Sequence, residues 1–420
     1  MSERRAILVV PEIPTPPRSG NAWRDLQQIN VLGALGFSVH VVAARRRWDL
    51  RDEEEIAGAR RLEGGVTYLT DVRTEPREAL ATRALRKARY VVGARRHPFG
   101  WWLPGTMPRT LRAVAAGAQP SDVALLRSIF IHDIPELRRS WPGRIVVDCH
   151  DSDVHLAGEL LSTVRGRARL GPWANLRGVR RAVARYLPLA DEVWTVSAED
   201  AARLATEAPG ARLLVVPSGM DERQAATGAS PGVDGSALLV ANFGYGPNAR
   251  GAAWLLREVW LHVRQQLPAA TLWLVGGRVP DDLAALAAAT PGVEVTGLVG
   301  DIAPLLRHAA IVVAPLLEGG GTRLKIVEAW SQGKAVVTTT KGVEGLPWSE
   351  AAVAVADAPD RFAAHVQALM SDAGRRRAMG AAALAIFQQR LSWEVARREV
   401  GAGSILAGAD RPSERARVEP

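Results

Sequence analysis

The chain lacks most features of exported and membrane-spanning proteins. It has one cysteine, Cys149, among its 420 residues, so no internal disulfide can form. Such cysteine usage is typical of a reducing cytoplasm. No apolar run approaches the roughly 18 residues of a spanning helix, and the apolar stretch after Arg5 is too short for a secretory signal. We therefore expect a cytoplasmic protein, either dissolved or peripheral on the inner face of the membrane.

Several binding signatures are absent too. The sequence has no zinc-ligand spacing, no aromatic-basic RNA signature and no helix-turn-helix pattern, so nucleic acid is not an expected partner. No GxGxxG motif follows the first apolar run, which leaves nicotinamide or flavin binding without support. The net charge is nevertheless +9, and this favours acidic partners such as nucleotides or anionic lipid. Hydrophobic residues make up 47% of the chain, enough for a large core.

Continuous apolar runs alternate with helical patterns along almost the whole chain. Strands are predicted at residues 6–10, 38–43, 123–126, 145–148, 192–197 and 213–217, and again at 237–243, 271–275, 293–296, 310–315 and 335–338. Unbroken Val/Ile/Leu runs are typical of buried parallel strands. Gly, Ala and Ser between the two series, at residues 221–235, indicate a linker. We therefore predict an α/β fold of two Rossmann-like, doubly wound domains that face a central cleft.

The most informative segment runs from Pro315 to Thr338. A strand-like run ends there in Gly319, Gly320 and Gly321, and Thr322 is a candidate cap for a helix that reaches about Gln332. A glycine loop that leads into a helix exposes backbone N–H groups at the positive end of the helix dipole, which suits a phosphate.

Three charged residues follow that loop. Arg323 and Lys325 lie in the first turn of the predicted helix, where the dipole disfavours cations unless an anion is nearby. Glu328 lies farther along, and its carboxylate could accept two hydroxyl groups. A loop that binds phosphate and a carboxylate that accepts two hydroxyl groups together indicate a nucleotide site. An ordinary β-loop-α connection with solvated charges is the simpler alternative.

Other loops at predicted strand ends add to this hypothesis. Gly244 and Asn248 follow the first strand of the second series, with Asn248 as a candidate helix cap. Val299 lies in a glycine-flanked loop where backbone groups could pair with a base edge. Gly20 precedes the first helix and is a candidate for a phosphate or acceptor loop, with a purely structural loop as the alternative.

Two further stretches have open interpretations. His150 follows a strand and could donate a hydrogen bond to a substrate hydroxyl or phosphate, or be a satisfied structural histidine. The neighbouring Asp151-Ser152-Asp153 looks like a DxD metal motif, although helix capping is the favoured reading, and no metal site is predicted. A basic stretch at residues 80–102 ends in two tryptophans, which suits either an anionic membrane surface or a solvated helix beside core tryptophans.

Together these residues resemble glycosyltransferase family 4, the retaining enzymes of the GT-B fold. The likeness spans nearly the whole chain and is strongest from Ala237 to Leu346, which contains GTRLKIVEAWSQGKAVVTTTKGVEGL. It implies an acceptor-binding domain at residues 1–215, a nucleotide-sugar-binding domain at 216–390, a helix at 391–409 that crosses back to the first domain, and a flexible tail at 410–420.

The resemblance also implies a donor and roles for single residues. The donor would be a nucleoside-diphosphate sugar that serves as a co-substrate, with UDP or GDP as the expected nucleotide. No cofactor or metal would be needed. The acceptor would be a glycan, a lipid-linked molecule or a small molecule. Glu328 matches a glutamate that holds the ribose, and His150 matches a histidine that contacts the transferred sugar. The position of the family's first glutamate is taken by Gly320.

A second departure concerns the diphosphate. The family's Arg/Lys pair is reduced here to Asn248 and Arg250, without the lysine. Our hypothesis is that Arg323 and Lys325 neutralise the diphosphate instead. A catalytically silent nucleotide-sugar-binding subunit remains the alternative, because the first glutamate is missing.

Overall fold

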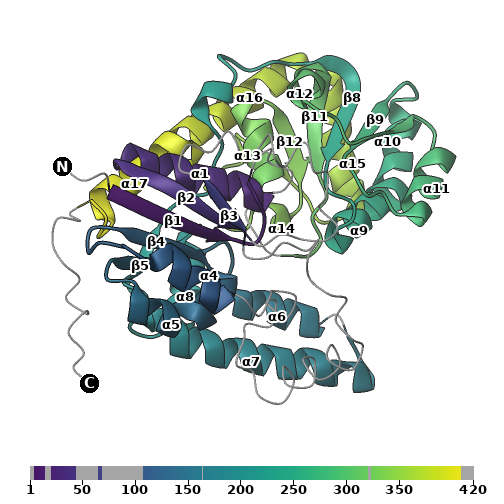
Figure 1. The fold of residues 1–420 in the computed structure, drawn as a ribbon. Helices are drawn as coiled ribbons and strands as arrows, with labels where there is room; N and C mark the ends of the chain where they lie inside the picture. Colours follow the sequence, from purple (N-terminus) through teal and green to yellow (C-terminus); the bar gives the residue numbers. More distant parts are fainter. Residues whose placement is uncertain are drawn as a thin grey trace. The chain divides into compact units, whose positions relative to one another are not determined.

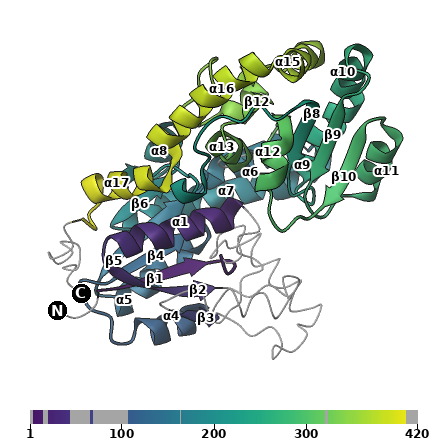
Figure 2. The ribbon, with the colours of Figure 1, turned by 90° about the horizontal axis from the view of Figure 1, so that it is seen from above.

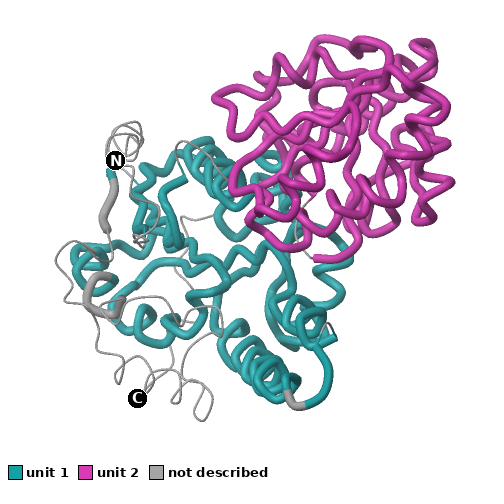
Figure 3. Tube along the Cα trace, turned by 90° about the vertical axis from the view of Figure 1, so that its right-hand side faces the viewer, with its two compact units in different colours: residues 1–217, 396–420 teal, residues 218–395 magenta. Residues whose placement is uncertain are grey.

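Parallel β-sheets form the frame of the protein in the computed structural model, which describes residues 4–14, 20–43, 65–68, 107–162, 164–319 and 323–407. These residues belong to two units (Figure 3). Unit 1 contains the residues up to Pro217 and those from Ala396 onward, and unit 2 runs from Ser218 to Val395. That the first unit binds the acceptor and the second the donor stays a prediction.

Unit 1 is built on a seven-stranded parallel sheet with the order β3-β2-β1-β4-β5-β6-β7. Its strands are β1 (Arg4–Val10), β2 (Phe37–Ala43), β3 (Val66–Tyr68), β4 (Val123–Arg127), β5 (Arg144–Cys149), β6 (Glu192–Thr195) and β7 (Leu213–Val215). The helices around it in Figure 1 are α1 (Gly20–Ala34), α4 (Met107–Ala115), α5 (Ile134–Ser140), α6 (Asp153–Ser162), α7 (Leu170–Tyr186) and α8 (Ala198–Glu207).

Both faces of this sheet are covered, which explains its unbroken apolar strands. Alternate residues of β1 enter different cores: Ile7 packs in a cluster with residues of α5 and α7, and Leu8 in a cluster with residues of α1. Helix α17 (Trp393–Gly403) covers the second face beside α1 (Figure 2), where Ala396 and Val400 are fully buried.

Unit 2 has a six-stranded parallel sheet with the order β10-β9-β8-β11-β12-β13. Its strands are β8 (Val233–Val240), β9 (Thr271–Val275), β10 (Val293–Gly297), β11 (Ala309–Ala314), β12 (Ala335–Thr338) and β13 (Ala354–Val355). Its helices are α9 (Gly246–Trp254), α10 (Trp260–Gln266), α11 (Asp281–Ala289), α12 (Ala303–His308), α13 (Leu324–Ser331), α14 (Thr340–Val343), α15 (Pro359–Ser371) and α16 (Ala373–Ile386).

The order in which successive strands are added to the sheet reverses once in each unit, between β1 and β4 in unit 1 and between β8 and β11 in unit 2. Such switch points leave a crevice beyond the carboxyl ends of the strands, where ligands of doubly wound sheets bind. The predicted α/β class with two doubly wound units is confirmed. None of the described helices is both long and apolar enough to cross a membrane.

Some predictions about single segments were wrong. Residues 221–235 are not a loose linker, since Val233 to Gly235 belong to β8 and a short 3-10 turn occupies Glu222–Gln224. Helix α9 begins at Gly246, so Asn248 lies inside the helix and does not cap it. Gly320, Gly321, Thr322, the basic stretch at 80–102 and the tail at 410–420 lie outside the described residues.

Candidate functional site

The switch point of unit 2 brings the start of α9 next to the start of α13. Helix α9 follows β8 and α13 follows β11, two neighbouring strands. A close approach tightens this arrangement: a Cβ added at Gly251 in α9 would lie 2.1 Å from the Pro315 carbonyl oxygen just after β11. Glycine at this position therefore lets α9 pack directly on the segment that leads to the glycine loop.

Asn248 and Lys325 meet across this junction. The ammonium of Lys325 donates to Asn248 Oδ1 at 2.8 Å, and Asn248 Nδ2 donates to the Asn242 carbonyl oxygen at 2.9 Å. The second bond fixes which end of the amide faces the lysine. Sequence reasoning expected Asn248 in the donor site as a helix cap; the geometry gives it a different task, that of holding the Lys325 side chain.

Lys325 is a cation without an anionic partner among the described residues. Its only hydrogen bond there is the one to Asn248. Burial, and after it the nearby Arg323 charge, lowers the pKa of Lys325 from 10.5 to about 8. At neutral pH the group is therefore still protonated, and two of its N–H donors can bind an added anion.

Arg323 is engaged differently from Lys325. Its side chain is 6% exposed, Nε donates to the Lys341 carbonyl oxygen at 3.1 Å, and Nη2 donates to that of Gly319 at 3.1 Å. Nη2 also lies 3.4 Å from Glu344 Oε2. Arg323 is the N-cap residue of α13, the position predicted for Thr322, and it makes no side-chain capping bond. The guanidinium thus ties the glycine loop to the start of α14.

We expect Arg323→Ala to destabilise unit 2 by about 1–3 kcal/mol, because partly buried carbonyl oxygens would lose their donors. Urea unfolding would measure this change, with the exposed Arg377→Ala as the matched control. An unchanged free energy of unfolding in Arg323→Ala would show that the loop does not depend on this guanidinium.

Glu328 lies one helical turn beyond Lys325 in α13. Burial, and then the Asp301 charge, raises the pKa of Glu328 from 4.5 to about 7. Within the described ranges its carboxylate makes no hydrogen bond or ion pair. Asp301 lies in the loop between β10 and α12 that also contains the partly buried Val299, so this loop borders the site on the Glu328 side.

The remaining predicted donor residues lie around the same sheet end. The backbone N–H of Gly244 donates to Asn242 Oδ1 at 3.1 Å, and a Cβ at Gly244 would meet the Arg278 side chain at 2.9 Å. Arg250, on α9, forms an ion pair with Glu318 at the edge of the glycine loop. The arginine at the place of the family's Arg/Lys pair is therefore paired with a carboxylate of the protein.

Unit 1 contains a separate group of buried charges at its own switch point. Arg24 binds both oxygens of Asp148, at 2.7 and 3.1 Å, and Arg127 lies 3.0 Å from Asp25 Oδ1. Sequence reasoning missed Arg24, Asp25 and Arg127. The first two lie on α1, whose first residue is the predicted loop residue Gly20. A charged side chain within an amphipathic helix gives no signal of burial when its partner lies far along the chain.

His150 belongs to this group. Its Nε2 lies 2.9 Å from Asp148 Oδ2, and its Nδ1 lies 3.2 Å from Asn21 Oδ1. Burial, and then the Arg127 charge, lowers the pKa of His150 to about 3, so the imidazole is neutral. Burial alone would raise the pKa of Asp148, but the Arg24 and His150 contacts hold it well below its usual range. A sugar-contacting role for His150 stays a prediction.

The DxD-like stretch has a capping geometry. Ser152 Oγ accepts from the His155 backbone N–H at 3.1 Å and donates to the Glu207 carboxylate at 2.8 Å. The cap of α6 is thus the serine between the two aspartates. In the described ranges no group of three or more His, Cys, Asp or Glu side chains could hold a metal ion.

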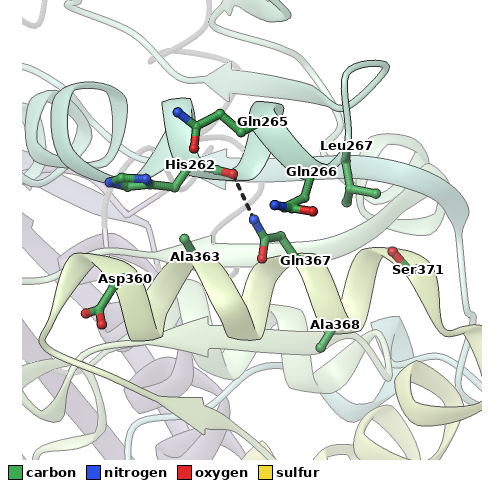
Figure 4. A pocket seen from close by; sticks show the side chains of 9 residues that line it. All are labelled: His262, Gln265, Gln266, Leu267, Asp360, Ala363, Gln367, Ala368 and Ser371. Carbon is green, nitrogen blue, oxygen red and sulfur yellow. Dashed lines mark hydrogen bonds between the residues drawn. The ribbon is translucent and has the colours of Figure 1, made fainter.

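A hollow on the outer side of unit 2 is unsuited to a nucleotide diphosphate. It measures about 580 Å³ and lies between α10 and α15, and Gln367 Nε2 donates to the His262 carbonyl oxygen at 2.8 Å across it (Figure 4). Among the described residues that line it, Asp360 is the one formally charged side chain. A diphosphate would meet a carboxylate there, so the α9–α13 junction is the better candidate.

A comparison with protein families matches part of unit 2. Residues 235–372 match the family model described as "Glycosyl transferases group 1", and this range contains the whole α9–α13 junction. No curated protein matches the sequence.

Solved structures resemble the chain over nearly its full length. A glycosyltransferase from Rickettsia africae is 12% identical with a TM-score of 0.63, over 98% of this chain and all (100%) of that one. HepE from Anabaena, in complex with UDP and glucose, is 15% identical with a TM-score of 0.62, over 94% and 98% of the two chains. TarM from S. aureus, in a complex that includes UDP, is 8% identical with a TM-score of 0.67, over 94% and 98%. The chain thus has the GT-B fold, and its residues 235–372 have the sequence pattern of the group 1 glycosyl transferases.

Proposed function

We propose that the protein is a retaining glycosyltransferase of family 4 that transfers a sugar from a UDP-sugar to a glycan, a lipid-linked or a small-molecule acceptor. One observation carries the proposal. Lys325, a cation with no anionic partner among the described residues, lies one helical turn from Glu328, a carboxylate without a described partner. Both lie at the switch point of unit 2, within the range that matches the group 1 glycosyl transferases.

The two groups match the two halves of a nucleoside diphosphate. Lys325 would bind the diphosphate, together with backbone N–H groups at the start of α13, and Glu328 would accept the two ribose hydroxyls. UDP is proposed over GDP because HepE, one of the similar structures, was solved with UDP and with UDP-glucose. No resident cofactor is required.

The chemistry follows from the charge that develops on the leaving group. As the bond from the anomeric carbon to the diphosphate oxygen breaks, negative charge accumulates on the phosphate and positive charge on the sugar ring. A preorganised ammonium at the phosphate stabilises the first of these charges without a metal ion. We propose attack by the acceptor hydroxyl from the same face, with its proton passing to the leaving phosphate oxygen, so retention needs no protein nucleophile. His150 of unit 1 is proposed to contact the transferred sugar.

A nucleotide panel tests donor binding. UDP is expected to raise the Tm of the protein more than GDP or ADP does, because ligand bound only to the folded state stabilises it by about 2.7 kcal/mol at 100 times its Kd. Differential scanning calorimetry would measure the midpoints. Equal, negligible shifts with all three nucleotides would contradict the proposal.

A second candidate function is a nucleotide-sugar-binding subunit without turnover. It is favoured by the ion pair between Arg250 and Glu318 and by Gly320 at the position of the family's first glutamate. Hydrolysis or transfer assays with UDP-sugars would separate the two candidates, since the subunit would bind donor and release no UDP. A sugar product formed from donor alone would instead indicate an epimerase.

A further inference from the structure

Helices α6 and α7 of unit 1 form a hairpin, and one end of this hairpin has no fully buried residue among those that the structure describes. None of the described residues from 158 to 178 is fully buried. Three large apolar side chains are exposed there: Leu160 is 47% exposed, Leu170 69% and Trp173 52%. We call this end, the described residues 158–162 and 164–178, the hairpin tip.

The hairpin is anchored by its other end. Val179, Ala182 and Val183 of α7 are buried in the core cluster that also contains Val154 and Ala157 of α6. The two helices run side by side in Figure 1. The buried end therefore anchors the hairpin in the core of unit 1. The exposed side chains of the tip are not part of that core.

The charge of this segment is predominantly positive. Residues 160–190 contain seven arginines and neither aspartate nor glutamate. Arg165, Arg169 and Arg177 are exposed, and the Arg177 guanidinium lies 5.7 Å from the centre of the Trp173 ring. Glu159, the one acidic residue of the tip sequence, lies 3.5 Å from His155 on its own helix. The tip thus combines exposed apolar side chains with exposed arginines.

We propose that the hairpin tip binds the surface of an anionic lipid bilayer. Trp and Leu side chains enter the boundary between headgroups and acyl chains, while arginines pair with lipid phosphates around them. Nucleic acid would use the arginines but would leave Leu160 and Leu170 in water, so a bilayer fits the whole tip better. The inference deepens the proposed function by giving the enzyme a surface on which to meet a lipid-linked acceptor.

Vesicle flotation of the full chain tests the proposal directly. Vesicles of phosphatidylcholine with about one third phosphatidylglycerol should bind the protein, and vesicles of phosphatidylcholine alone should bind it much more weakly. Raising the salt from about 0.1 M to about 1 M shortens the Debye length from about 10 Å to about 3 Å and should release it. Leu170→Ser with Trp173→Ser, and separately Arg165→Gln with Arg169→Gln, should each weaken binding about tenfold.

Matched substitutions on unit 2 serve as controls. Leu261→Ser and Trp348→Ala remove side chains that are 53% and 42% exposed, and Arg257→Gln with Arg377→Gln removes two exposed arginines. These variants should bind vesicles like the wild type. Tip variants that bind as strongly as the wild type would overturn the proposal, as would tip-dependent binding to duplex DNA without binding to vesicles. UDP should still raise the Tm of the tip variants. The test of vesicle binding by the tip is then independent of the test of donor binding.

Discussion

Lys325→Ala is expected to lower turnover with a UDP-sugar donor by roughly 10²–10³-fold, the cost typical of removing one preorganised donor to a developing oxyanion. The fold should be unaffected, because the only described hydrogen bond lost is the one to Asn248 and the desolvated ammonium is itself a cost to stability. Initial rates and urea unfolding of the same preparations would measure the two effects.

Lys334 offers a matched control for this substitution. Burial and then the Arg376 charge lower its pKa to about 8 as well, but its ammonium donates to the Ser230 carbonyl oxygen at 2.9 Å. Lys334→Ala should therefore reduce stability and leave the turnover of the folded fraction unchanged. Wild-type turnover in Lys325→Ala, or equal losses of turnover in both variants, would remove Lys325 from the donor site.

The pH profile gives an independent readout. A lysine with a pKa of about 8 loses its proton as the pH rises past that value, so turnover should fall above about pH 8. In Lys325→Arg the guanidinium stays charged, and this fall should move to higher pH or vanish. A turnover that holds constant from pH 7 to about pH 10 would contradict the assignment.

The strands could be predicted from sequence because each follows one rule. Buried parallel strands are apolar on both faces, and the predicted bounds of Thr271–Val275 and Ala335–Thr338 are those of the structure. The order of strands in each sheet then places the glycine loops at a switch point. The strands therefore followed from pattern alone, whereas the strand order that places the candidate site at a switch point came from the structure.

The partners of individual side chains could not be predicted in this way. Arg24 and Asp148 are 124 residues apart in sequence, and Lys325 and Asn248 are 77 apart. Arg323 and Lys325 look equivalent in the sequence motif, yet one donates to backbone carbonyls and the other to an amide oxygen. Such differences depend on which loops meet after folding, and no local pattern encodes them.

The use of lysine along the chain carries a further signal. Of the 53 basic residues only four are lysines, and three of these, Lys325, Lys334 and Lys341, lie within 17 consecutive residues that begin with the lysine of the candidate site. In a chain that otherwise uses arginine, lysine at these positions supplies a compact ammonium in place of a planar guanidinium. Composition thus distinguishes Lys325 from Arg323, although the motif itself treats them alike.

Glu328→Gln is expected to stabilise the protein and to weaken UDP binding. The pKa of Glu328 rises from 4.5 in the unfolded chain to about 7 in the folded one, so between these values the folded state binds the extra proton. Stability therefore falls as the pH rises from about 4.5 to 7, and above pH 7 the ionised carboxylate costs up to about 3 kcal/mol. Glutamine removes this cost at pH 8 and has no such effect near pH 4.5.

UDP binding would offset the cost of the buried Glu328 carboxylate, because two ribose hydroxyls would donate hydrogen bonds to it. The neutral amide oxygen of Glu328→Gln accepts hydrogen bonds more weakly, so this variant should bind UDP less tightly. Urea unfolding at pH 8 and at about pH 4.5 would measure the change in stability. Calorimetric titration of UDP at pH 8 would measure the change in affinity. The exposed Glu350→Gln should change neither quantity. A Glu328→Gln variant that is less stable at pH 8, or that binds UDP as the wild type does, would mean that this carboxylate is held for the fold. A gain in stability together with a loss of UDP affinity would instead identify Glu328 as a destabilising group whose hydrogen bonds the donor completes.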